Sequence, residues 1–224
     1  MTKRMILPLL FGLIGCAILV SLGTWQVKRL AWKEAILSEI DARITAPAVA
    51  LPESIDPDVD VYLPVQAQGT FGDDRIRVLV SQKKVGAGYR IISPFTTNGR
   101  TIMVDRGVIP IADELPTSPT GSVEVTGNLH WPNEVDSYTP DPDTNRDIWF
   151  ARDVEQMAAK LGTDPVLLIL RSATPATPEI LPLPVSRFGI PNDHLSYAIT
   201  WFSLATIWFV MTGILLWRIR QRTV

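Results

Sequence analysis

The chain has 224 residues, of which 46% are hydrophobic, and its charges are strongly segregated. Residues 5–27 and 195–217 contain no Asp, Glu, Lys or Arg, whereas all 23 acidic residues and 16 of the 21 basic residues lie between them. This segregation excludes a soluble cytosolic protein and a fully disordered chain. The net acidic middle segment also excludes an electrostatic binder of nucleic acid, which needs a basic patch on its folded part.

The two uncharged stretches are each long enough to cross a bilayer as a helix. A hydrocarbon core of ~30 Å requires about 20 apolar helical residues, and each stretch meets that length. Both carry aromatic residues that suit the headgroup level, Trp25 on the first and Tyr197, Trp201 and Trp217 on the second. The sequence therefore predicts two transmembrane helices.

The charges at the chain ends predict the topology. Short cationic tails stay on the cytoplasmic side of a membrane, and both tails here are basic. We therefore expect a cytoplasmic tail and the first transmembrane helix over residues 1–27, followed by a large external domain over residues 28–194. The second transmembrane helix would follow over residues 195–217, and a basic cytoplasmic tail over residues 218–224. The membrane would be the inner membrane of a bacterium, with the main domain in the periplasm, or the mitochondrial inner membrane in a eukaryote.

The first stretch also permits a second interpretation. Leu13-Ile14-Gly15-Cys16 resembles the box at which a lipoprotein signal peptide is cleaved and lipidated. The chain stays apolar after Cys16, where a mature lipoprotein usually begins polar, so we favour an uncleaved helix. Gly12, Gly15, Cys16 and Gly23 fall near one helical face, and small residues let two membrane helices approach closely. The second transmembrane helix is the expected partner of this face.

The middle segment is predicted to be rich in β-structure. It holds 17 of the 18 prolines, which disfavours a helical bundle. Short alternating runs bounded by turns such as Asn98-Gly99 predict an antiparallel sheet or small barrel, with strands over 62–70, 75–81, 89–93, 101–109, 122–129 and 166–173. Two helices are expected, one over 28–44 continuing the first span and one over 153–161, with Asp153 and Gln156 as a capping box and Gly162 at its end. Irregular loops are expected over 46–60, 132–147 and 174–191. The predicted fold class is thus two transmembrane helices flanking one β-rich α+β extramembrane domain.

A search for catalytic residues gives little. The chain has two histidines and lacks a Gly-x-Ser-x-Gly elbow, a phosphate-binding loop and a Cys-x-x-Cys pair. His130 follows a predicted strand and is expected to be an edge or surface residue. His194 directly precedes the second span, where a neutral imidazole is a suitable axial ligand for haem iron. An interfacial residue near the helix N-terminus is the alternative role for His194.

His194 also begins a stripe at helical spacing that continues through Tyr197, Trp201, Leu204 and Trp208. A histidine with aromatic residues beneath it suits a flat macrocycle with an apolar tail. The same stripe equally suits an ordinary contact between two helices.

Four segments resemble motifs of the Surfeit-locus protein one family. They are Leu22–Lys33, Val104–Pro110, Trp149–Asp153 and Asn192–Phe202, which we call the first, second, third and fourth motifs in chain order. The second motif departs from the family pattern at Asp105 and Val108, where Asn and Trp are common. Arg106 and Gly107 of this motif match the family pattern. We expect them at a strand-end turn, where an external arginine could meet an anionic group.

The resemblance implies an assembly factor for haem–copper cytochrome c oxidase, a chaperone of respiratory-chain biogenesis rather than an enzyme. It further implies haem a binding, with His194 as the candidate iron ligand beside Tyr197 and Trp201. The haem propionates would lie near basic side chains outside the membrane, and Lys28, Arg29 and Arg187 are candidates whose alternative role is headgroup anchoring. Implied partners are the catalytic subunit of the oxidase, haem a synthase and membrane lipid, with no nucleic acid.

Two alternatives stay open beside this function. A protein-only scaffold could hold oxidase subunits with His194 in a structural role. A membrane-tethered enzyme is disfavoured because the sequence lacks a catalytic constellation.

Overall fold

The computed structural model describes residues 3–82, 86–143, 145–187 and 190–222. Parts of two expected loops, at 144 and 188–189, lie outside the described residues. The chain divides into two compact units, one of residues 1–39 and 187–224 and the other of residues 40–186.

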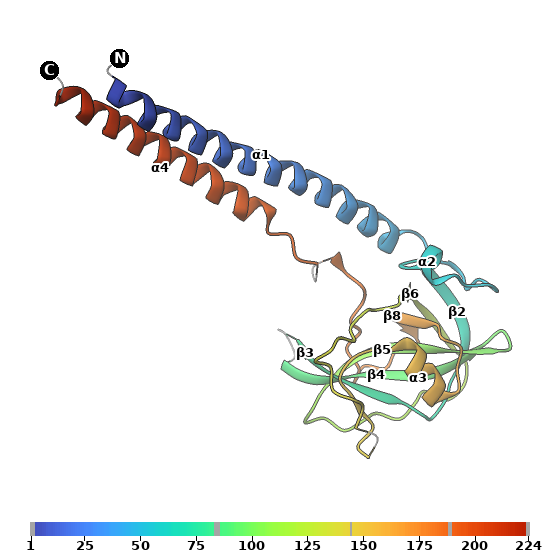
Figure 1. The fold of residues 1–224 in the computed structure, drawn as a ribbon. Helices are drawn as coiled ribbons and strands as arrows, with labels where there is room; N and C mark the ends of the chain where they lie inside the picture. The colour runs from blue at the N-terminus through green and yellow to red at the C-terminus, as the bar shows by residue number, and fades with distance from the viewer. Residues whose placement is uncertain (1–2, 83–85, 144, 188–189, 223–224) are drawn as a thin grey trace. The chain divides into compact units, whose positions relative to one another are not determined.

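The first unit contains most of α1 (Lys3–Thr45) and all of α4 (His194–Gln221). The two helices lie side by side, and α1 begins at the end of the pair where α4 ends (Figure 1). Both are long and apolar enough to cross a membrane. The helix expected over 28–44 is confirmed as an unbroken continuation of the first apolar stretch.

Small residues on α1 bring the two helices together. A Cβ atom added to Gly15 would lie only 2.4 Å from the indole Nε1 of Trp208. That indole N–H donates a hydrogen bond of 3.2 Å to the carbonyl of Gly12, and the Sγ of Cys16 lies 3.8 Å from the carbonyl oxygen of Ala205. The predicted contact between the small-residue face and the second apolar helix is therefore confirmed.

The second unit is a β-barrel with one substantial helix. All six predicted strands are confirmed with shifted ends, as β2 (Pro64–Phe71), β3 (Ile76–Gln82), β4 (Gly86–Thr97), β5 (Arg100–Pro110), β6 (Val123–Leu129) and β8 (Leu167–Thr174). The short β1 (Val49–Ala50) and α2 (Pro57–Asp60) interrupt the region expected to be an irregular loop over 46–60, so that expectation is wrong in part. The two-residue β7 (Ile148–Trp149) was also not predicted.

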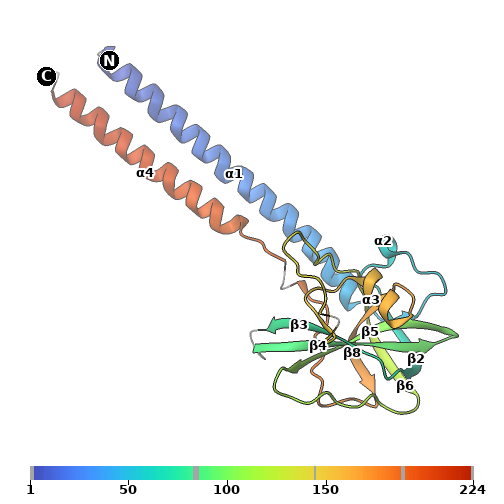
Figure 2. The ribbon, with the colours of Figure 1, turned by 60° about the horizontal axis from the view of Figure 1, so that its bottom comes forward.

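The strands follow the order β1-β2-β6-β8-β5-β4-β3-β7, and an additional pairing of β2 with β4 closes the barrel (Figure 2). Most neighbours are antiparallel, as predicted, but β5 and β8 are parallel, and so are the pairs that the two-residue strands form, β1 with β2 and β3 with β7. Asn98 and Gly99 both have positive φ and form the tight β4–β5 turn. Closure depends on Gly69, because a Cβ there would lie 2.1 Å from the carbonyl oxygen of Thr96.

Both faces of the central strands are buried. Ile102 and Val104 of β5 point into the barrel, whereas Met103 packs outside it against Met157 of α3 (Val154–Leu161). The predicted ends of this helix are confirmed, because the side chain of Asp153 accepts from the N–H of Gln156 and Gly162 adopts a left-handed conformation. The third motif therefore leads into a helix that packs on Met103, the residue immediately before the second motif.

Candidate functional site

The first and fourth motifs meet at a hydrogen bond within the helix pair. His194 is the first residue of α4, and its Nδ1 lies 2.8 Å from Oε1 of Gln26 on α1. Gln26 is only 8% exposed although its side chain is polar. The sequence placed the two residues in separate motifs but gave no sign that they are partners.

This hydrogen bond determines which imidazole nitrogen is available. With the amide oriented so that Oε1 faces the ring, the oxygen can only accept, so Nδ1 carries the proton. The lone pair of a neutral ring then resides on Nε2, which makes no hydrogen bond within the described part of the chain. Metal-bound histidines commonly donate their other N–H to an oxygen in this way, which fixes the tautomer and the ring orientation.

The stripe below His194 divides between two surfaces. Trp208 packs against α1, as the helix-contact interpretation expects. Tyr197 is 56% exposed and Leu204 is also exposed, so both face away from α1, while Trp201 is half-buried at the border. Tyr197 and Trp201 thus present an aromatic surface beside His194.

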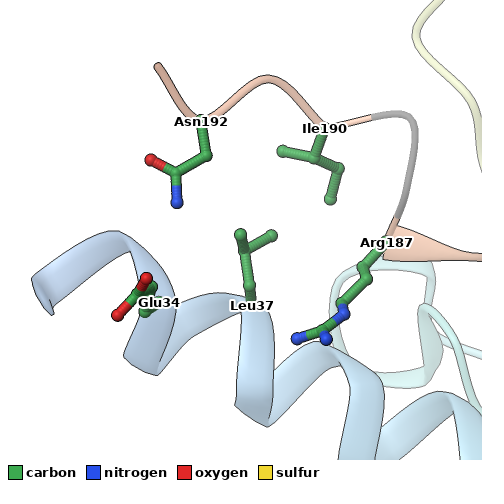
Figure 3. A pocket seen from close by; sticks show the side chains of 5 residues that line it. All are labelled: Glu34, Leu37, Arg187, Ile190 and Asn192. Carbon is green, nitrogen blue, oxygen red and sulfur yellow. The ribbon is translucent and has the colours of Figure 1, made fainter. Parts of the chain in front are cut away.

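A cavity of about 420 Å³ lies in the same unit as His194 (Figure 3). Glu34 and Leu37 of α1 line one side, and Arg187, Ile190 and Asn192 of the segment before α4 line the other. Leu37 and Ile190 point toward one another between the polar side chains (Figure 3). Oδ1 of Asn192 is buried without a hydrogen-bond partner in the described structure. The sequence did not indicate Glu34, which lies one residue beyond the first motif.

The three candidate basic residues differ in position. Arg187 lines the cavity. The guanidinium of Arg29 stacks on the ring of Trp32 at 4.1 Å, and Lys28 is exposed. Of the three, Arg187 is therefore the one placed to meet an anion in this cavity.

The second and third motifs meet in the other unit at a buried carboxylate. Asp105 is 1% exposed and forms ion pairs with Arg90 and, at 3.3 Å, with Arg152. Arg152 also contacts Glu134, and the backbone N–H of Gly107 donates to Oδ1 of Asp105 at 3.2 Å. An acid at position 105 is thus explained by the two guanidinium groups that face it.

Two expectations for the second unit need correction. His130 directly follows β6, as predicted, but it is partly buried, stacks on Tyr62 at 5.2 Å and has a buried Nδ1 without a partner in the described structure. Burial, assisted by the charge of Arg152, lowers the pKa of His130 to about 4. Arg106 and Gly107 lie inside β5, not at a strand-end turn, because pairing with β4 continues past them to Pro110.

The comparisons with known proteins agree with the motifs. Residues 13–206 match the SURF1 family model. The chain is similar to Surfeit locus protein 1 of Rattus norvegicus, with 27% identity over 84% of this chain and 70% of the relative. It is also similar to SURF1-like proteins of Drosophila melanogaster (33% identity, 91% and 76%) and Rickettsia bellii (31% identity, 95% and 90%).

Proposed function

Because the chain belongs to the SURF1 family, whose members are assembly factors of cytochrome c oxidase, we propose that it binds haem a through His194 during assembly of the oxidase. The hydrogen bond between His194 and Gln26 is the observation that carries this proposal. It leaves Nε2 as an unprotonated donor at the start of an apolar helix, which is the ligand chemistry that haem iron accepts.

The surrounding residues fit an amphipathic macrocycle. Haem a, when bound, supplies an iron atom, two propionates and a farnesyl tail. Nε2 of His194 would hold the iron, Tyr197 and Trp201 would contact the ring, and Arg187 would attract a propionate. Apolar side chains exposed along α4 offer a surface for the tail.

We place the first apolar stretch and α4 across the membrane with both chain ends in the cytoplasm and residues 28–194 outside, in the bacterial periplasm. Basic tails support this orientation. Alkaline phosphatase fused after Gly121 should be active and a fusion at the C-terminus inactive. The reverse pattern would contradict the orientation.

The proposed partners are the catalytic subunit of the oxidase, which would receive the haem, and haem a synthase, which would supply it. Both are embedded in the lipid that surrounds the helix pair. A protein-only scaffold remains the second candidate function, and it is favoured by the extent to which α4 is already packed on α1. Under that alternative the bond between His194 and Gln26 would be structural.

The test is the visible spectrum of the full chain, purified in detergent from cells that make haem a. Wild type should carry haem a, and His194→Ala should lose most of it while remaining inserted, because alanine supplies no donor atom. Tyr197→Ala and Trp201→Ala should give intermediate losses. His130→Ala is the matched control and should keep the wild-type ratio.

Two results would contradict the proposal. His194→Ala with the wild-type haem ratio would exclude His194 as the ligand and favour the scaffold. Wild-type protein without haem a, from cells that make it, would exclude haem handling while leaving the oxidase assembly role intact.

A further inference from the structure

A second cavity, of about 330 Å³, lies between β5, β8 and residues 176–182 of the barrel unit. Its existence depends on Gly107, which has φ +121° and would place a Cβ 2.1 Å from the carbonyl oxygen of Leu181. The missing side chain lets Val108 and Leu181 exchange two backbone hydrogen bonds of 2.8 and 2.9 Å. This pairing holds the segment against the strand, so that it forms one wall of the cavity.

Arg106 lines this cavity as a buried and incompletely bonded cation. It is only 2% exposed, and Nη2 donates one hydrogen bond of 3.0 Å to the hydroxyl of Thr177. Nη1 is buried without a partner in the described structure, where no carboxylate pairs with this guanidinium. The guanidinium also lies over the ring of Phe71, 4.9 Å from its centroid, and the charge of Glu179 attracts it without forming an ion pair.

This arrangement is costly in the absence of a counter-ion. A guanidinium has five N–H donors, and a buried charge without a partner destabilises a fold. Burial, reinforced by the like charge of Arg75 and opposed in part by the charge of Glu179, lowers the pKa of Arg106 to about 10, so the side chain is still charged at neutral pH. A group that brought a negative charge to Nη1 would offset this cost.

We propose that this cavity binds a small carboxylic acid with an apolar chain, its carboxylate on Arg106 and its chain against the apolar wall. Most of the lining is apolar, including Leu170, Ile180, Leu181 and Pro182. The volume lies near the lower end of ligand pockets, which span ~300–1,000 Å³. The site is independent of the haem a proposal, because every lining residue belongs to the barrel unit.

The chemistry of the site favours a monoanion over a phosphate. Arg171 also lines the cavity, but its Nη2 is already bonded to the carbonyl of Ile44 and to Oδ1 of Asn128. One guanidinium with a free nitrogen matches a single carboxylate, whereas a phosphate dianion requires several donors.

The test is calorimetric titration of the full chain in lipid nanodiscs, with empty nanodiscs as the blank. Octanoate should bind saturably, while 1-octanol, octylamine and inorganic phosphate should bind at least about tenfold more weakly, because each lacks either the carboxylate or the chain. Octanol binding as tightly as octanoate would overturn the proposal, and so would phosphate binding more tightly or octanoate failing to saturate.

Variants identify the site. Arg106→Met removes the charge, keeps an apolar side chain of similar length and should weaken octanoate binding by roughly tenfold or more. Arg77→Met is the matched control and should bind as wild type, because Arg77 does not line the cavity and donates instead to the carbonyl of Arg146. Ala176→Trp tests the cavity without altering Arg106, and it should abolish binding by filling the space. Retained affinity in either Arg106→Met or Ala176→Trp would place octanoate elsewhere and overturn the assignment.

Discussion

The buried carboxylate of Asp105 allows a quantitative prediction about the barrel. Asp105→Asn keeps the shape of the side chain and an acceptor for the N–H of Gly107 but removes the negative charge between Arg90 and Arg152. Removing one partner of a buried ion pair costs ~3–5 kcal/mol, a large share of a total stability of ~5–15 kcal/mol. We expect the loss to lie toward the lower end, because Arg152 keeps Glu134 as a partner.

A second ion pair in the same barrel supplies the control. Arg100 and Asp164 lie 2.7 Å apart but are partly exposed, so Asp164→Asn should cost only ~0–1 kcal/mol. Pulse proteolysis of the full chain in detergent, over a urea series, measures both losses. Adding Arg90→Met to Asp105→Asn should recover at least ~1 kcal/mol, because the uncompensated guanidinium is removed. Equal losses for the two Asp→Asn variants, or no recovery in the double variant, would refute the buried-charge argument.

Three further predictions concern other parts of the molecule. Gln26→Leu removes the acceptor for the imidazole N–H and should weaken haem a binding by ~10–100-fold. Gln26→Glu should retain haem a, because its carboxylate still accepts from the imidazole. Haem titration followed by absorbance measures the affinity of both variants. The free energy of unfolding of the wild type should fall as the pH decreases from about 6.5 to about 4, because the unfolded chain takes up a proton on His130 that the folded chain does not. His130→Phe removes this group and should reduce the loss by ~1–3 kcal/mol, as measured by urea unfolding across that pH range. Gly15→Leu should destabilise the helix pair by ~1–3 kcal/mol in titration with sodium dodecyl sulfate followed by circular dichroism, whereas Gly213→Leu, which meets open space, should not.

The sequence predicted most elements because their signals are local. Alternation located the long strands, and Asp153 with Gly162 marked both ends of α3. The two-residue strands β1 and β7 are too short to produce a periodic signal. β4 is longer than predicted because its pairing with β5 continues through Pro94, a residue that usually ends a strand.

The sequence predicted the residue at the candidate site, His194, but not the side chain that bonds to it. Its position before an apolar helix identified His194, but nothing local to either motif indicates that Gln26 lies opposite it. Burial of Arg106 was equally hidden, because an arginine in a strand is normally exposed. Here Phe71 and residues 176–182, which are distant in the sequence, cover it. Contacts between segments far apart in the chain leave no pattern in either one.

The strand order has a consequence for biosynthesis. β8 is the last strand to be made, yet it lies between β6 and β5 and bonds to both. A chain that emerges from its N-terminus therefore cannot complete the barrel until residue 174 has appeared, although five of its longer strands are available by residue 129. Until then β5 and β6 each keep an unpaired edge that could pair with another chain. Only about twenty residues separate the end of β8 from α4, so barrel completion and the arrival of the second apolar helix should nearly coincide in time.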